Sequence, residues 1–125
     1  MISPINTTDR LAELVRSAIP KRGGAPEKID PATRTFMALR MAVNDEVANL
    51  QALLERAPSR LSPGGRLAII SFHSTEDRLV KVALRHADEL GQLSIVTKKP
   101  ITPSDEELDA NPRSRSSKLR VAEKK

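Results

Sequence analysis

The chain has 125 residues, 38% of them hydrophobic and 30% charged, which fits one soluble domain with a hydrophobic core and argues against a disordered protein. No apolar run approaches the roughly 20 residues of a membrane-spanning helix, and the N-terminus carries no basic and apolar signal segment. Without cysteine, and with two histidines at no paired ligand spacing, the chain offers neither a disulfide framework nor a zinc site, and we expect a cytoplasmic protein that binds no metal.

The net charge of +5 is concentrated at the C-terminal end of the chain. Residues 1–112 hold equal numbers of acidic and basic side chains, whereas residues 113–125 hold six basic side chains and the single acid Glu123. Such a cluster is typical of a surface that binds phosphate-rich partners, and a solubilising tail is the alternative. Two phenylalanines, without tryptophan or tyrosine, leave little aromatic surface for stacking on single-stranded bases.

The first predicted element is an amphipathic helix introduced by Thr7, Thr8 and Asp9. Apolar residues recur at helical spacing up to Pro20, which ends the pattern. Residues 20–31 are rich in proline, glycine and charge, and they predict a linker. Lys21, Arg22 and the two glycines after them could cradle a phosphate, but a flexible connection is the simpler interpretation.

The longest predicted helix begins at Asp30, whose carboxylate can accept from the first-turn amides, and at Pro31, which fits the first helical position. Apolar residues at spacings of three and four continue as far as Leu54 and define one buried face. Arg34 and Arg40 lie off this face. A solvated helix surface and a phosphate contact are both compatible with them.

Residues 62–65 predict a turn that leads into the strand Leu67–Phe72. The nearly continuous apolar character of this strand predicts burial on both faces, as in a parallel sheet. Ser74 and Asp77 have the spacing of a capping box, so we expect a helix to begin there and to end at Gly91.

Two further strands are predicted toward the C-terminus. Residues 92–98 form an apolar strand, and the long loop after it holds one helical turn opened by Thr102 and the proline that follows. In the last segment, residues 118–124, Leu119 and Val121 alternate with the other side chains, which predicts a strand with one buried face.

The polar cluster His73–Asp77, at the end of the first predicted strand, has four interpretations. A Ser-His nucleophile pair lacks the G-x-S-x-G turn, and a metal site needs more ligands than His73 and a carboxylate. In the third interpretation, Ser74 and Asp77 cap the following helix while Glu76 complements its positive end. In the fourth, His73 with Ser74 contacts a substrate, since α/β proteins often place binding groups where strands end.

No glycine loop with an acidic residue downstream is present, so no cofactor motif supports an enzyme by itself. The chain nevertheless closely resembles the C-terminal part of the bacterial MraW/RsmH family. The resemblance rests on three segments in order, "DPATRTFMALRMAVNDEV" (30–47), "LSPGGRLAIISFHSTEDRLVK" (61–81) and "TKKPITPSDEELDANPRSRSSKLRVAE" (97–123). The chain departs from the family pattern, without disturbing it, at Asp30, Met37 and Thr75.

The resemblance implies an S-adenosylmethionine-dependent methyltransferase that modifies the exocyclic N4 amine of a cytidine in the decoding region of small-subunit rRNA. It implies an α/β fold: the C-terminal half of a Rossmann-like class I methyltransferase sheet, about three strands with flanking helices, plus one helix of the helical insertion. Residues 1–29 would be the end of that insertion and a linker, and residues 30–125 the C-terminal half of the core. The last two strands would form an antiparallel pair.

The family's S-adenosylmethionine loop and main catalytic segment would lie upstream, so we expect no cofactor site in this chain and no activity from it alone. His73 and Ser74 would line the rim where the cytidine enters. The expected partners are small-subunit rRNA or the ribosomal subunit, and an N-terminal half chain. A non-enzymatic basic RNA-binding module and one half of a split methyltransferase are the alternatives. The residues expected to contact RNA phosphates are Arg34, Arg40, Arg113, Arg115, Lys118 and Arg120.

Overall fold

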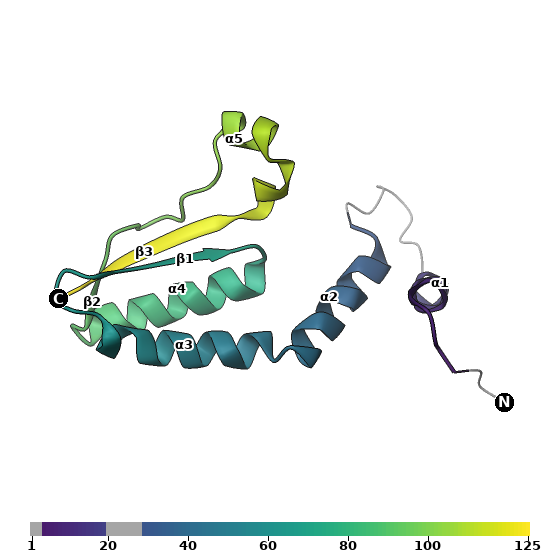
Figure 1. Ribbon diagram of the computed structural model, residues 1–125, viewed down its shortest axis with the longest axis horizontal. Coiled ribbons are helices and arrows are strands. Elements are labelled where there is room, and N and C mark those ends of the chain that lie inside the picture. Colours follow the sequence, from purple (N-terminus) through teal and green to yellow (C-terminus); the bar gives the residue numbers. More distant parts are fainter. Residues whose placement is uncertain (1–3, 20–28) are drawn as a thin grey trace. The chain divides into compact units, whose positions relative to one another are not determined.

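The computed structural model describes residues 4–19 and 29–125, which fall into two compact units, residues 1–46 and 47–125 (Figure 1). The sequence divided the chain after residue 29, at the end of the predicted linker, and the division into an insertion segment and a core half stays a prediction. Most of the predicted linker, including the phosphate cradle proposed for Lys21 and Arg22, lies outside the described residues. None of the described helices is long and apolar enough to cross a membrane.

The first unit contains helices α1 (Thr8–Ala18) and α2 (Pro31–Val43), which contact each other. The predicted starts of both helices are confirmed. The Thr7 hydroxyl accepts from the Arg10 amide at 3.2 Å, and the Asp30 carboxylate accepts from the Ala32 amide at 2.8 Å. The Arg16 guanidinium lies 2.9 Å from the Asp30 carboxylate, so the cap of α2 is also an ion-pair partner of α1.

The prediction of one long helix reaching Leu54 is wrong, because the chain turns between α2 and α3 (Glu46–Arg60). Asn44 ends α2, and Asp45 adopts a left-handed conformation with φ of 49°. Asparagine and aspartate tolerate such conformations, since their short polar side chains bond locally to the backbone. The apolar spacing continues on both sides of this break, so periodicity alone could not reveal it.

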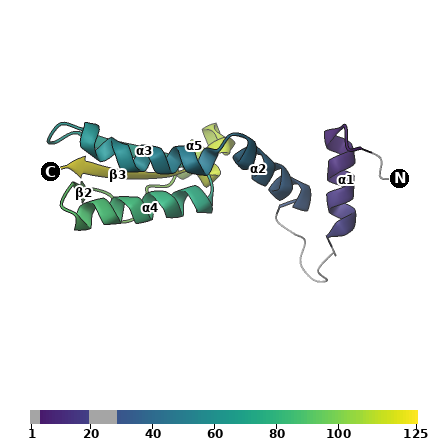
Figure 2. The same cartoon turned by 90° about the horizontal axis from the view of Figure 1, so that it is seen from below.

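The second unit is a mixed α/β structure with a three-stranded sheet, which confirms the predicted number of strands and their flanking helices. Strands β1 (Arg66–Ser71), β2 (Leu93–Ile95) and β3 (Lys118–Lys124) lie in the order β1-β3-β2, and β3 is antiparallel to both neighbours. Helices α3 and α4 (Ser74–Glu89) lie side by side against one face of the sheet (Figures 1 and 2). The core between these layers consists of Leu54, Val80, Leu84, Ala87, Leu93 and Ala122.

The predicted burial of β1 on both faces is wrong. Leu67 and Ile69 pack against the core, whereas Ile70 is 58% exposed and Phe72, just after the strand, is 56% exposed. Both helices that pack on the sheet cover the same face, so every second side chain of β1 points to the open face. The pairing of Ile70 with Leu119 places an apolar residue of β3 on this open face as well.

The long loop before β3 contains helix α5 (Asp105–Ala110) and the 3-10 helix η1 (Pro112–Ser116). The predicted helical turn is present, but α5 is capped by Ser104, whose hydroxyl accepts from the Glu107 amide at 3.2 Å, and not opened at Thr102. Helix α5 is followed at once by η1, so the residues Arg113 and Arg115 lie on a short helix and not in an extended tail.

Candidate functional site

His73 is the residue that caps helix α4. Its Nδ1 accepts from the Glu76 amide at 3.3 Å, and the Glu76 carboxylate accepts from the Phe72 amide at 3.1 Å. The predicted capping box of Ser74 and Asp77 is therefore wrong. His73 and Glu76 have the same spacing one residue earlier, but Glu76 accepts from the amide of Phe72, the residue before the cap, so the arrangement is a variant of the capping box. His73 retains an extended backbone while Ser74 already has helical geometry, so the helix begins one residue earlier than the sequence pattern suggested.

The second ring nitrogen of His73 is buried, and no hydrogen-bond partner for it is found within residues 4–19 and 29–125. Because Nδ1 accepts the Glu76 amide, the neutral ring carries its hydrogen on Nε2. That atom lies 3.3 Å from the Glu76 carboxylate, within ion-pair distance but outside hydrogen-bond geometry. The capping role therefore fixes the imidazole, whose side chain is 13% exposed, at the end of β1. Ser74 is exposed on the first turn of α4, and the role of both residues at a substrate rim stays a prediction.

Replacing His73 by alanine should lower the free energy of unfolding by about 1 kcal/mol, because the Glu76 amide loses its acceptor at the helix start. A His73→Asn variant supplies a side-chain oxygen that accepts at the same place, so it should retain most of that stability. Urea unfolding of both variants measures the difference. Equal destabilisation by alanine and asparagine would contradict the capping role.

Arg120 forms a buried ion pair with Asp77 between β3 and α4. Its guanidinium donates from two nitrogens to the Asp77 carboxylate, at 2.7 and 3.2 Å, and its side chain is 10% exposed. Lys118 lies farther off, with its ammonium 3.5 Å from the same carboxylate. The hydrogen bond from Arg120, followed by its charge and that of Lys118, lowers the pKa of Asp77, so this carboxyl is ionised at neutral pH.

The expectation that Arg120 contacts RNA phosphates is corrected by this geometry. On β3 the buried face is that of Arg120 and Ala122, which are 8% and 0% exposed, while Leu119 and Val121 are only partly buried. Helices α3 and α4 cover this face, so the Arg120 guanidinium is enclosed and its charge is balanced by Asp77.

The other predicted phosphate contacts lie in two different units. In the first unit Arg34 is exposed on α2, and the Arg40 guanidinium lies 2.8 Å from the Glu46 carboxylate. In the second unit Arg113 and Arg115 are exposed on η1, and the Lys118 side chain is 39% exposed. Their contact with phosphates stays a prediction.

Three exposed basic residues of α4, Arg78, Lys81 and Arg85, were missed by the sequence reasoning. They do not stand out in the net charge, because residues 1–112 contain as many acidic as basic side chains. Their spacing of three and four was the available signal, since it places them on one side of a helix.

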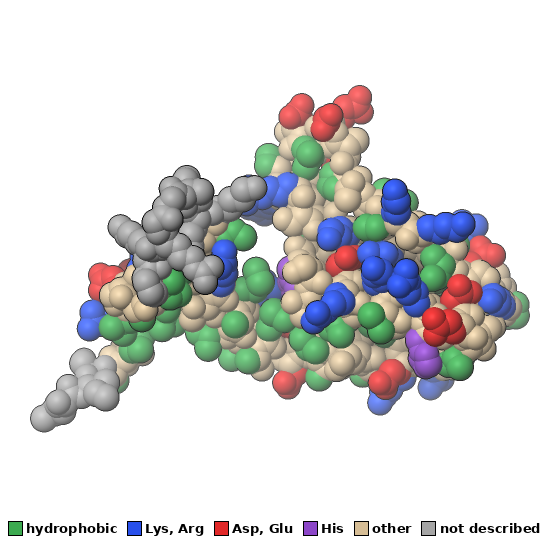
Figure 3. All heavy atoms as spheres, turned by 180° about the vertical axis from the view of Figure 1, so that it is seen from behind, with side chains coloured by type: hydrophobic (Ala, Val, Ile, Leu, Met, Phe, Trp, Pro, Cys, Tyr) green, Lys and Arg blue, Asp and Glu red, His purple; other side chains and the backbone are tan. Residues whose placement is uncertain are grey.

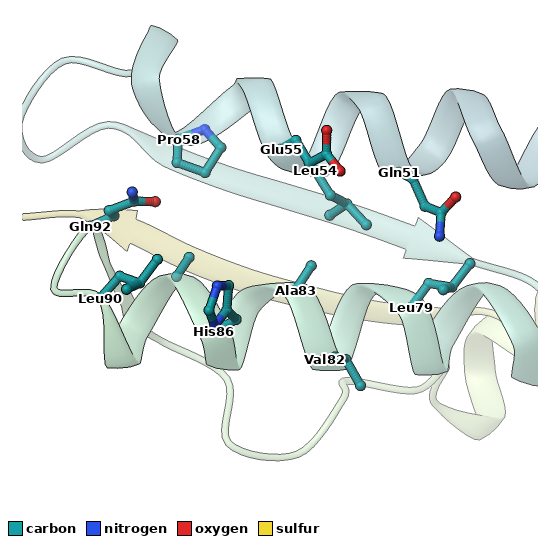
Figure 4. A pocket seen from close by; sticks show the side chains of 11 residues that line it. Gln51, Leu54, Glu55, Pro58, Leu79, Val82, Ala83, His86, Leu90 and Gln92 are labelled. Atoms are coloured by element: carbon teal, nitrogen blue, oxygen red, sulfur yellow. The ribbon is translucent and has the colours of Figure 1, made fainter.

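A groove of about 410 Å³ lies between α3 and α4, and Figure 4 looks onto it with the sheet behind. Apolar side chains of both helices form most of its wall, and Gln51, Glu55, His86 and Gln92 are its polar members. S-adenosylmethionine carries a ribose, an amino-acid group and a sulfonium cation, which require several converging polar partners. A groove with one carboxylate and a largely apolar wall does not fit that cofactor.

Comparison with known proteins identifies relatives along nearly the whole chain. The model of the MraW methylase family matches residues 1–125. A protein named ribosomal RNA small subunit methyltransferase H from Synechococcus elongatus is 53% identical over 121 residues, which are 97% of this chain and 40% of the relative. Proteins of the same name from Acidobacterium capsulatum and Trichormus variabilis are 52% and 54% identical over 122 residues, 98% of this chain and 40% and 39% of theirs. The chain thus spans about 40% of the length of the curated relatives it matches.

Proposed function

The chain belongs to the MraW methylase family, and from this membership we infer that it forms part of an S-adenosylmethionine-dependent methyltransferase that acts on small-subunit rRNA. The observation that carries the proposal is the identity of about half the residues to proteins named ribosomal RNA small subunit methyltransferase H. The methyl acceptor that we propose is the exocyclic N4 amine of a cytidine in the decoding region. His73 and Ser74 are its candidate contacts at the end of β1.

We propose that this chain supplies the substrate rim and part of the RNA-binding surface, and that residues outside this chain bind the methyl donor. Two features of the second unit support it. Strand β1 pairs with β3 on one side and lies at an edge of the described sheet, and Ile70 and Phe72 expose apolar surface on its open face. Edges and apolar faces of this kind fit a larger sheet, in which further strands and helices cover them. We therefore propose that the isolated chain is inactive.

A non-enzymatic RNA-binding module is the second candidate. The exposed basic residues of η1 favour it, and so does the lack of fit between S-adenosylmethionine and the α3–α4 groove. The two candidates differ in one requirement, since a methyltransferase needs the upstream part of its relatives and a binding module does not.

A chimera tests the proposal. The part of the Synechococcus elongatus relative that precedes the aligned region would be joined to this chain and incubated with labelled S-adenosylmethionine and unmethylated small ribosomal subunits. We expect methylation of cytidine by the chimera, and none by the chain alone or by the upstream part alone. An inactive chimera, with the intact relative active under the same conditions, would contradict the proposed enzyme.

The thermal stability of the isolated chain provides an independent check on the donor site. Ligand at a hundred times its dissociation constant stabilises a protein by about 2.7 kcal/mol, which raises the melting temperature of a domain of this size by several degrees. We expect no rise with S-adenosylmethionine. An upward shift would show that this chain alone builds a donor site.

A further inference from the structure

Helix α4 carries a row of exposed positive charges on the side that faces away from the core. Arg78, Lys81 and Arg85 are exposed, whereas Val80 and Leu84 are 1% and 4% exposed on the opposite side. At 1.5 Å per residue, the row extends about 10 Å along the helix. We call these three residues the α4 basic stripe.

Most of the acidic side chains of α4 are engaged with groups other than the stripe. Asp77 is bound to Arg120, and Asp88 lies 3.1 Å from the Lys125 ammonium. The Glu76 carboxylate accepts from the Phe72 amide at the helix start. Asp77 and Asp88 are thus engaged with residues outside the helix, and Glu89, exposed four positions after Arg85, is the remaining acid near the C-terminal end of the stripe.

Further basic side chains extend this surface beyond the stripe. Lys118 reaches the same Asp77 that lies one residue before Arg78, so it adjoins the N-terminal end of the stripe. Lys98 and Lys99 are also exposed. They lie beside β3, because Thr97 and Ile101 on either side of them form hydrogen bonds with the β3 backbone. Figure 3 shows Lys and Arg side chains gathered on this side of the second unit.

We propose that the α4 basic stripe binds consecutive phosphates of an RNA strand, a surface that rests on the proposed function as an rRNA methyltransferase. Guanidinium groups bind phosphate oxygens in a bidentate manner, and two of the three stripe residues are arginines. The stripe begins on the first turns of α4, next to Ser74. An RNA strand bound along it would therefore lead to the candidate substrate rim.

The composition of the stripe favours RNA phosphates over a membrane surface. A helix that lies on a membrane presents a broad apolar face rich in leucine, phenylalanine or tryptophan below its basic residues. The large apolar side chain most exposed within residues 78–85 is Val82, at 60%, and the other apolar side chains of that segment are buried or partly buried. Since the stripe contains no aromatic side chain, it would bind the phosphate backbone of the RNA and not its bases.

The test measures how binding of the chain to a helix of small-subunit rRNA depends on salt. In the variant Arg78→Gln/Arg85→Gln, the slope of log K against log salt should fall in magnitude by about 1.4 to 1.8, since each lost phosphate contact removes about 0.7 to 0.9. The matched control is Arg56→Gln/Arg60→Gln, which removes two exposed arginines from α3. It should leave the slope unchanged.

Each outcome decides the proposal. An unchanged slope in the stripe variant, an equal fall in the control, or no binding by the wild-type chain would overturn it. So would loss of binding to phosphatidylserine vesicles with an unchanged RNA slope, which would assign the stripe to a membrane. Activity of the chimera separates the two proposals: an active chimera with an unchanged slope refutes the stripe alone, and an inactive chimera with a reduced slope refutes the enzyme alone.

Discussion

Replacing Asp77 by asparagine should lower the free energy of unfolding by about 3–5 kcal/mol, because it leaves the Arg120 guanidinium buried without its counter-charge. The side chains of Asp77 and Arg120 are 13% and 10% exposed, so water cannot replace the lost partner. Lys118 adds a second positive charge next to the same position. Domains of this size are stable by only about 5–15 kcal/mol, so the loss would be visible in urea unfolding at neutral pH.

The matched control is Asp88→Asn. Asp88 lies on α4, like Asp77, and its carboxylate forms an ion pair with Lys125. The side chains of that pair are 40% and 45% exposed, and surface ion pairs contribute about 0–1 kcal/mol. A loss below about 1 kcal/mol for both variants would mean that Arg120 is solvated like a surface residue, and would contradict the burial of the pair.

The effect of Asp77 should also depend on pH in a defined direction. Arg120 lowers the pKa of Asp77 in the folded chain, so the unfolded chain binds its proton at a higher pH. The stabilisation is therefore complete above the pKa of an unfolded aspartate, about 3.9, and is lost as the pH falls through the lower folded pKa. The stability difference between wild type and Asp77→Asn should shrink below about pH 4. A difference that is constant down to pH 2 would contradict this linkage.

Replacing Leu93 by alanine should lower the free energy of unfolding by about 2–5 kcal/mol, since it opens a cavity in a closed core. Leu93 is 0% exposed and packs in the cluster that contains Val80 and Leu84 of α4. It begins the three-residue strand β2, so the same side chain joins that short strand to the helix layer.

Leu90→Ala is the control for this cavity. Leu90 precedes Leu93 by three positions but is 58% exposed, so its truncation should change stability by less than about 0.5 kcal/mol. Thermal or urea unfolding of the two variants compares them directly. Equal losses would show that the core is not closed around Leu93.

The features that the sequence predicted correctly are those set by neighbouring residues. Thr7 and Asp30 cap their helices because their side chains reach amides two or three residues away. The turn before β1 is equally local: Gly64 has φ of 78°, and a Cβ on Gly65 would lie 2.8 Å from the Ser62 carbonyl oxygen. The family could also be identified from the sequence, because three long segments in fixed order resemble it.

The candidate site was predicted less well, because two local patterns competed there. Both His73–Glu76 and Ser74–Asp77 have the three-residue spacing of a capping box, and a histidine is an uncommon first member. The choice between them depends on Asp77, which is bound to Arg120 from another element and cannot cap the helix.

The sequence by itself thus determined the family, through three long segments in fixed order, and predicted the three strands. It also determined the starts of α1 and α2, which rest on hydrogen bonds spanning two or three residues. Only the tertiary structure decided which face of β3 is buried, because helices α3 and α4 both pack on the side of Arg120 and Ala122. The pairing of Arg120 with Asp77 joins residues 43 positions apart. No pattern along the chain predicts such a pair, because its strength depends on the burial of both side chains between the sheet and the helices.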